Sequence, residues 1–177
     1  MSAVGGGMLQ VRDVGRTDID VLARLKPPVA LHRDRLRDAE AGALQYCVIE
    51  AEGAIVGFGC LVFRRPATWS DAGDARNVPE IVDLFVTPEA RGRGVASYFV
   101  RALEARAVAR GEWTLFLAVS PQESAAAHRL YERLGYRALD PVPFRKQWAF
   151  VDLDGAQHSG SGWVIEMARD LRRRDGA

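Results

Sequence analysis

The residues whose types and spacing best fit a chemical task form one short loop, Arg91-Gly92-Arg93-Gly94-Val95-Ala96. The loop follows a strand-like apolar run, Glu80 to Val86, and opens a long segment with helical spacing of apolar residues. Backbone N–H groups at the start of a helix lack internal acceptors, and the helix dipole adds a partial positive charge there. Glycines let a ligand approach the main chain closely, and Arg91 or Arg93 adds charge. The pattern therefore predicts a phosphate-binding loop between a strand and a helix.

A second motif lies further along the chain, from Ser124 to Tyr136, and ends in Leu130-Tyr131-Glu132-Arg133-Leu134-Gly135-Tyr136. Together the two motifs resemble the GNAT family of N-acetyltransferases. In that family the acyl-CoA loop follows Arg/Gln-x-x-Gly-x-Gly/Ala, and the second motif ends in Leu-Tyr-x-x-x-Gly-Phe/Tyr. The likeness is specific from Glu80 to Tyr136 and covers Leu9 to Leu139 in general layout. One departure is Ser124, which stands where many relatives have asparagine.

The resemblance implies the GNAT fold, an α/β (α+β) architecture. Its central mixed, largely antiparallel sheet is splayed between its middle strands and has helices on both faces. The resemblance also implies that acetyl-CoA is the cosubstrate and that its pantetheine arm runs beside the strand that ends at Val86. Hydrogen bonding to the main chain there would allow the side chains to be purely apolar. The cofactor-binding residues predicted in this way are Leu84, Phe85, Val86, Arg91, Gly92, Arg93, Gly94, Val95, Ala96, Ser124 and Tyr131.

Two carboxylates on this strand, Glu80 and Asp83, are candidates for acid–base chemistry. An alkylammonium has a pKa of about 10.4, so holding it neutral at pH 7 costs about 4.6 kcal/mol and a positioned base is useful. Glu80 matches the catalytic glutamate of the histone-acetylating branch, and Asp83 resembles the acidic groups of the polyamine-acetylating branch. We expect Glu80 to act as base through a water molecule and Asp83 to hold the amine, with the roles reversible. Side chains alternate along a strand, so both reach one acceptor only if a β-bulge intervenes; either could instead pair with an arginine.

Tyr131 matches the family tyrosine that lies near the sulfur of CoA. A phenol, with a pKa of about 10, is a weaker acid than a thiol, with a pKa of about 8.5. Hydrogen-bond stabilisation of the leaving thiolate is therefore the expected catalytic role, and full proton donation is its limiting case. A purely structural tyrosine in the core is the alternative.

The acceptor site is less well defined by the sequence. The segment from Arg64 to Pro79 has turn chemistry around Trp69, which indicates a loop beside the acceptor, although Trp69 could equally cover an edge of the core. The predicted substrate-binding residues are Trp69, Glu80 and Asp83. Aromatic residues that could wall the pocket are Trp69, Phe144, Trp148, Phe150 and Trp163.

The predicted reaction is direct attack of a small-molecule primary amine on the thioester. No serine or cysteine nucleophile motif occurs in the sequence, which argues against an acyl-enzyme. His32 and His158 have no carboxylate or cysteine partners at ligand spacing, so we expect no metal.

Length and composition fit one intracellular domain. The chain has 177 residues, within the range of a single domain, and we expect a flexible leader at 1–7, one acetyltransferase domain at 8–170 and a flexible tail at 171–177. With 24 basic and 23 acidic residues the formal charge is +1, which offers no global field for nucleic acid or an anionic membrane. No apolar run approaches the roughly 20 residues that span a bilayer, and no signal peptide is visible. We expect a cytoplasmic enzyme and leave open a homodimer.

Periodicity and breakers predict mixed secondary structure. The predicted helices span 18–25, 29–41, 94–109 and 121–134. The predicted strands span 9–13, 44–51, 54–63, 80–86, 113–119, 136–139 and 163–168. Residues 140–162 are assigned only a turn, at Asp154-Gly155.

Cys47 and Cys60 lie on the two strands of a predicted hairpin. If Ala51 pairs with Ala54, Cys47 faces Phe58 and Cys60 lies diagonally on the same side of the hairpin. A disulfide is then conceivable, but two small core residues are the preferred interpretation.

Two other functions stay open. The chain could be an acyl-CoA-binding regulatory module without turnover, which Ser124 slightly favours, or an acetyltransferase for a protein or aminoacyl-tRNA. A basic groove of Arg33, Arg37 and the run Arg172-Arg173-Arg174 would support a macromolecular acceptor. The near-neutral net charge argues against tRNA, and we expect no nucleic-acid partner. Arg33, Arg35 and Arg37 alternate with acidic residues, which predicts a solvated face of ion pairs rather than a phosphate site.

Overall fold

The structure, a computed structural model, describes residues 3–4, 7–66, 69–71 and 78–173. The leader predicted at 1–7 and the tail predicted at 171–177 therefore lie partly outside the described residues. Within them, Ala3–Val4 forms the short strand β1, which pairs with β2, and the Arg172 guanidinium lies 2.9 Å from an Asp170 carboxylate oxygen.

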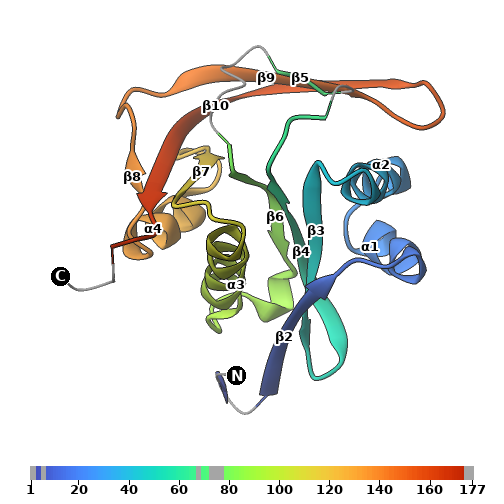
Figure 1. Ribbon diagram of the computed structural model, residues 1–177, viewed down its shortest axis with the longest axis horizontal. Helices are drawn as coiled ribbons and strands as arrows, with labels where there is room; N and C mark the ends of the chain where they lie inside the picture. Colours follow the sequence, from blue (N-terminus) through green and yellow to red (C-terminus); the bar gives the residue numbers. More distant parts are fainter. Residues whose placement is uncertain (1–2, 5–6, 67–68, 72–77, 174–177) are drawn as a thin grey trace.

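Helices and strands alternate along the chain much as the periodicity predicts (Figure 1). The helices are α1 (Ile19–Leu25), α2 (Val29–Glu40), α3 (Val95–Ala109) and α4 (Ala125–Arg133), with 3₁₀ turns at Arg16–Asp18 and Pro88–Ala90. The strands are β1 (Ala3–Val4), β2 (Gly7–Asp13), β3 (Leu44–Ala51), β4 (Ala54–Val62), β5 (Trp69–Asp71), β6 (Glu80–Val86), β7 (Thr114–Val119), β8 (Arg137–Ala138), β9 (Phe144–Val151) and β10 (Gln157–Asp170).

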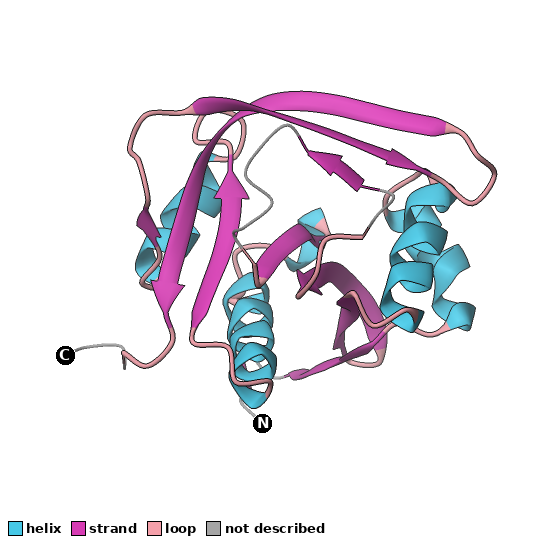
Figure 2. Ribbon diagram, turned by 45° about the horizontal axis from the view of Figure 1, so that its top comes forward, coloured by secondary structure: helices cyan, strands magenta, loops and turns pink. Residues whose placement is uncertain are grey.

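The strands of the described residues form one sheet in the order β1-β2-β3-β4-β6-β7-β10-β9-β5, with β8 added to β10. Neighbours are antiparallel except β6 and β7, which run parallel. Helices α1 and α2 cover one face of the sheet, and α3 and α4 cover the other (Figure 2). The predicted architecture is confirmed: a mixed, largely antiparallel sheet with helices on both faces.

Strands β6 and β7 diverge soon after they meet. In the described chain they pair only at Glu80 with Phe116 and at Ile81 with Leu117. On its other side β6 pairs Val82 with Cys60 and Phe85 with Phe58, so that two residues, Asp83 and Leu84, face Gly59 alone. Asp83 takes a φ of 56°, as a bulged residue can. The splay and the bulge predicted for the middle of the sheet are therefore both present.

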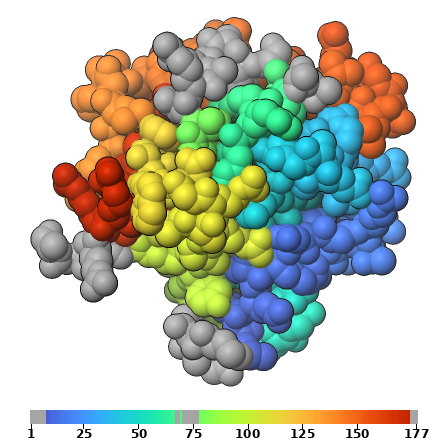
Figure 3. Space-filling view, viewed as in Figure 1, coloured from blue at the N-terminus to red at the C-terminus, as the bar shows by residue number. Residues whose placement is uncertain are grey.

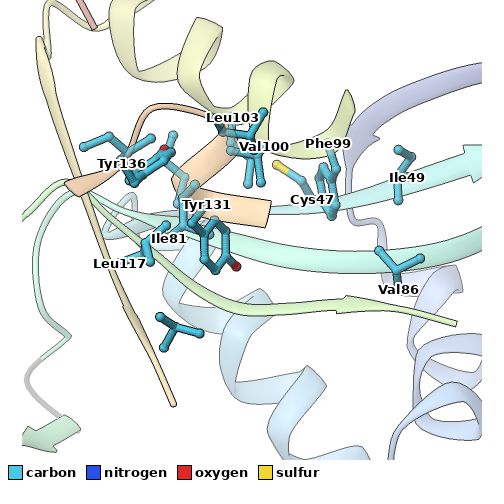
Figure 4. Close-up of a cluster of buried hydrophobic side chains, with 14 of the residues drawn as sticks. Cys47, Ile49, Ile81, Val86, Phe99, Val100, Leu103, Leu117, Tyr131 and Tyr136 are labelled. Atoms are coloured by element: carbon cyan, nitrogen blue, oxygen red, sulfur yellow. The ribbon is translucent and has the colours of Figure 1, made fainter. Parts of the chain in front are cut away.

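Apolar residues on the two faces of the sheet form two cores. The helical spacing of apolar residues predicted after the glycine loop is confirmed, because five such residues of α3 lie in the larger core: Val95, Phe99, Val100, Leu103 and Ala107. Figure 4 shows Phe99, Val100 and Leu103 packed over the sheet beside Cys47. The helix that follows the glycine loop is thus fixed against the sheet along its whole length, which holds its N-terminus in place.

A long hairpin, absent from the prediction, crosses one end of the molecule. The segment 140–162 was predicted to contain only a turn, whereas Phe144–Val151 forms β9 and pairs with the first half of β10 (Figure 1). The turn at Asp154-Gly155 is confirmed, with Asp152 Oδ1 accepting the N–H groups of Asp154 and Ala156 at 2.9 Å. Most side chains of β9 are exposed or half-buried, so no continuous apolar pattern marks the strand in the sequence. Its tip, coloured orange, lies beside α2 (Figure 3), where Leu153 meets Leu36 and Arg37 across a shallow groove.

The predicted relation of the two cysteines is wrong. A bulge between Ile49 and Glu50 shifts the hairpin register, so Cys47 pairs with Gly59 and Cys60 pairs with Tyr46. Cys47 packs in the core under α3, and Cys60 packs in the core under α1 and α2, on opposite faces of the sheet. Both are free, buried thiols whose pKa values burial raises, which fits the interpretation as small core residues.

Candidate active site

A cavity of about 540 Å³ opens where β6 and β7 diverge; we call it the splay cavity. Its floor is β6 and the end of β7, one wall is the connection between α1 and α2, another wall is α4, and its roof is β5 and β9. The lining residues are Lys26, Pro27, Pro28, Leu31, Arg35, Arg65, Trp69, Glu80, Ile81, Val82, Asp83, Leu84, Ala118, Val119, Ser120, Ser124, Ala127, Tyr131, Lys146, Trp148, Ala149 and Phe150. The cavity therefore joins the strand that leads to the glycine loop and the second sequence motif to the hairpin that the sequence did not reveal.

The bulge brings both predicted carboxylates into the splay cavity, and each is paired with a cation. Asp83 Oδ2 lies 2.7 Å from Arg35 Nε. Glu80 is only 3 % exposed, accepts a hydrogen bond from Arg65 and lies 3.2 Å from Lys146 Nζ. The alternative left open from the sequence, pairing with an arginine, thus describes the geometry of both carboxylates.

Trp69 lies in the roof of the cavity and contacts Arg35. The Arg35 guanidinium carbon is 4.0 Å from the centre of the Trp69 ring and 5.4 Å from that of Phe150. Trp69 Nε1 donates to Asp38 at 3.0 Å, and Trp69 pairs with Phe150 across β5 and β9. The residue that was predicted to lie in a loop is therefore in a short strand in the roof of the cavity. Of the other aromatic candidates, Trp148 and Phe150 line the cavity, whereas Phe144 and Trp163 do not.

Tyr131 lies at the α4 side of the cavity, where the sheet opens. It reaches from α4 past Ile81 (Figure 4), is 7 % exposed and packs edge-on against Tyr136 with the ring centres 5.8 Å apart. Burial raises the pKa of Tyr131 to about 12. The phenol is therefore protonated across the physiological range and serves as a hydrogen-bond donor. Ser124, just before α4, lines the same side of the cavity.

The glycine loop has the conformation of an anion site. Gly92 and Gly94 have φ values of 73° and 79°, which side chains rarely adopt. Within the described chain, the backbone N–H groups of residues 92 to 96 have no hydrogen-bond acceptor. Arg91 Nε donates to Val86 O at 3.0 Å, so this side chain ties the loop to the end of β6, while Arg93 stays exposed. The loop can accept a diphosphate on its main chain without displacing a protein contact.

Not every predicted cofactor residue faces the cavity. Leu84 lines it, but Phe85 does not; Phe85 packs against the core under α1 and α2 and stacks on Phe58 with ring centres 5.2 Å apart. Val86 and Val95 are buried in the core under α3, next to the loop. These side chains position the backbone along which a pantetheine arm would lie.

Four cations of the cavity were not identified as site residues from the sequence: Lys26, Arg35, Arg65 and Lys146. The prediction of a solvated face on α2 is wrong for Arg35, which is 7 % exposed, and for Asp34 and Asp38, which are also buried. The helix places three polar residues on one face at three-residue spacing: His32, Arg35 and Asp38. This spacing was the available sign that these residues share one environment.

Two features are absent from the described residues. They contain no group of three or more histidine, cysteine, aspartate or glutamate side chains placed to hold a metal ion. In the same residues, none of the helices has both the length and the apolar character needed to cross a bilayer.

Comparison with known proteins gives the class. The model of the acetyltransferase (GNAT) family matches residues 17–136. Among solved structures, a ribosomal-protein-alanine N-acetyltransferase from Brucella melitensis matches with a TM-score of 0.67 at 17 % identity, covering 92 % of this chain and 99 % of that one. A phosphinothricin acetyltransferase from Sinorhizobium meliloti, in complex with acetyl-CoA, matches with 0.67 at 18 % identity, covering 92 % and 88 %. A spermidine N-acetyltransferase from Vibrio cholerae, in complex with CoA and spermine, matches with 0.65 at 18 % identity, covering 93 % and 96 %.

No curated protein matched the sequence. The family model nevertheless spans more than half of the chain, and the chain belongs to the GNAT family of acetyltransferases. The resemblance stated from the two motifs is confirmed. Acetyl-CoA-dependent acetyl transfer is the chemistry of this class, and at these low identities the structural neighbours show the fold alone.

Proposed function

We propose that this protein is an N-acetyltransferase that moves an acetyl group from acetyl-CoA to a primary amine of a small molecule. The observation that carries the proposal is the splay cavity, which brings Tyr131 and Ser124 of the second motif to one volume with Glu80 and Asp83. A roof of Trp69, Trp148 and Phe150 covers that volume. A covered cavity of about 540 Å³ suits a small acceptor better than a protein or tRNA.

The reaction requires one bond to form and one to break. The neutral amine nitrogen attacks the thioester carbon, the C–N bond forms, and the C–S bond breaks with CoA leaving as a thiolate. An ammonium acceptor gives up two protons, one to solvent through a base and one to the CoA sulfur. The diphosphate of acetyl-CoA would bind to the N–H groups of residues 92 to 96, and the pantetheine arm would follow β6 to Leu84.

The contacts of the carboxylates support a division of labour. Glu80 has a 4 % exposed side chain and is engaged by both Arg65 and Lys146, so its main task is to hold those cations. Asp83 has a 30 % exposed side chain and Arg35 as its ion-pair partner, which leaves it accessible from the cavity. We assign Asp83 as the group that meets the amine and takes its proton, directly or through water, the reverse of the first expectation.

Tyr131→Phe should lower kcat for thiol release about tenfold or more, because a hydrogen bond to a charged group contributes about 1.5–3 kcal/mol. Acetyl-CoA affinity should stay unchanged. Since the pKa of Tyr131 is about 12, the rate should show no loss from its ionisation below about pH 11. Steady-state thiol release between pH 6 and pH 10 tests this, with Tyr98→Phe on α3 as the matched control. Unaltered turnover in the Tyr131 variant would show that this residue has only a structural role in the core.

Thiol release from acetyl-CoA with a panel of small amines tests the proposal itself. Acceptor-dependent release with acetyl-CoA bound supports it. Tight acetyl-CoA binding without release for any amine would favour the regulatory module instead. The cytoplasmic location, the homodimer and the lack of a metal stay predictions from the sequence.

A further inference from the structure

The splay cavity carries an excess of positive charge. Four cations line it, Lys26, Arg35, Arg65 and Lys146, against two carboxylates, Glu80 and Asp83. Two nearby carboxylates outside the lining do not reverse the balance. Glu166 lies 3.9 Å from Lys146, and Asp38 is paired with Arg37 at 2.9 Å. A site for a purely cationic amine would need the opposite balance.

Arg35 supplies the most specific observation. Its side chain is 9 % exposed, and its Nε is committed to Asp83 at 2.7 Å. Its Nη1 is buried and has no hydrogen-bond partner within the part of the chain that the structure describes. A buried guanidinium N–H without an acceptor is costly, and Arg35 borders the cavity. An oxygen of a bound anion would satisfy it.

Lys26 adds a further positive charge to the lining of the cavity. It is exposed, its Nζ lies 5.6 Å from the centre of the Phe85 ring, and it forms no ion pair with the described residues. Its backbone is held in place because Lys26 O accepts from His32 Nε2 at 2.6 Å, while His32 Nδ1 accepts from the Tyr46 hydroxyl, also at 2.6 Å. Burial lowers the pKa of His32, which keeps the imidazole neutral and this arrangement intact.

The phosphates of acetyl-CoA do not explain these cations. The loop of residues 91 to 96 follows the far end of β6 and does not line the splay cavity. From Glu80 to Val86, six steps along a strand cover about 20 Å. The cations around Glu80 and Asp83 are therefore at the acceptor end of the site.

We infer that the acceptor is a primary amine that also bears an anionic oxygen group, such as a carboxylate, with its ammonium toward Asp83 and its anion toward Arg35 and Lys26. The inference rests on the proposed function and narrows its substrate class from amines in general to zwitterionic amines. Arg35 then joins both ends of the acceptor, since it orients Asp83 through Nε and binds the anion through Nη1.

The test uses amines matched in length, with 4-aminobutyrate against butylamine and 1,4-diaminobutane. Two measurements are made: kcat/KM for thiol release, and affinity for the CoA-bound protein by calorimetry. The anionic amine should exceed both others at least tenfold in each. Preference for the diamine, equal response to all three, or binding of none would overturn the inference. Selective binding of the anionic amine without turnover would support the inference and contradict the proposed function. Turnover with a preference for the diamine would support the proposed function and contradict the inference.

Variants of the lining cations test which residues bind the anionic group of the acceptor. Lys26→Met, at an exposed position, should lower affinity for 4-aminobutyrate about fivefold to tenfold and leave affinity for butylamine and CoA unchanged. Arg35→Lys keeps the charge but removes the Nη1 donor, and should reduce the same selectivity more strongly. Arg33→Gln, an exposed arginine of α2 outside the cavity, is the matched control. If Lys26→Met changes affinity for charged and uncharged amines alike, the anion contact is refuted even if Arg35→Lys fails to fold.

Discussion

Gly94→Val should reduce acetyl-CoA affinity about 100-fold or more, the largest single effect that we expect on ligand binding. Gly94 has a φ of 79°, and a β-branched residue there is strained by about 1–2 kcal/mol. The new side chain would also stand among the N–H groups of residues 92 to 96 and block a diphosphate from them. Each lost charge-assisted hydrogen bond contributes about 1.5–3 kcal/mol, and each 1.4 kcal/mol is about tenfold in affinity.

Calorimetric titration with acetyl-CoA measures this loss. Gly111→Val is the matched control, because Gly111 follows the other end of α3, has a φ of 84° and meets no atom within 4 Å of an added Cβ. It shares the backbone strain without the ligand contact. Wild-type affinity for acetyl-CoA in Gly94→Val, or an equal loss of affinity in Gly111→Val, would contradict the assignment of the loop to the cofactor site.

Glu80→Gln should lower the free energy of unfolding by about 3 kcal/mol, because it removes the buried carboxylate that two half-buried cations share. Glu80 is 3 % exposed, and the side chains of Arg65 and Lys146 are 16 % and 15 % exposed. At about 2–4 °C per kcal/mol for a domain of this size, the melting temperature should fall by roughly 10 °C.

Denaturant unfolding measures the change in stability, and Glu123→Gln, at an exposed position, should stay within about 0.5 kcal/mol of wild type. A Glu80→Gln protein with wild-type stability but no turnover would show that Glu80 is the base and that its role as a holder of cations is secondary. A loss of stability with kcat preserved at temperatures well below the melting transition supports the assignment of Asp83 as the group that takes the proton.

The sequence predicted those elements whose pattern is local. The strand from Glu80 to Val86, the glycine loop and the apolar face of α3 each follow from spacing over a few residues, and all are present. The bulge at Asp83 was expected in kind, because two carboxylates three positions apart needed it to share an acceptor. Local pattern thus predicted the elements to which we assign acetyl-CoA binding.

The side of the cavity that we propose for the acceptor depends on long-range packing that single-sequence patterns do not encode. Strand β9 has few buried positions, so the sequence carries no clear alternation that predicts a strand. Its strand conformation is defined by pairing with β10 and β5. Arg35 looks like one member of a surface charge series, yet Asp83, Trp69 and Phe150 enclose it from elements distant in sequence. Likewise, one bulge after Ile49 reversed the face on which a cysteine lies.

Strand β10 belongs to two neighbourhoods at once. Its last residues, Ile165 to Asp170, pair with β7 in the body of the sheet, and its first residues, Gln157 to Val164, pair with β9 above the cavity. The half that lies over the proposed acceptor site thus pairs with a different neighbour from the half that pairs with β7. If the proposed function holds, exchange of residues 144–164 between family members should alter acceptor choice and leave the proposed acetyl-CoA site on β6, α3 and α4 intact.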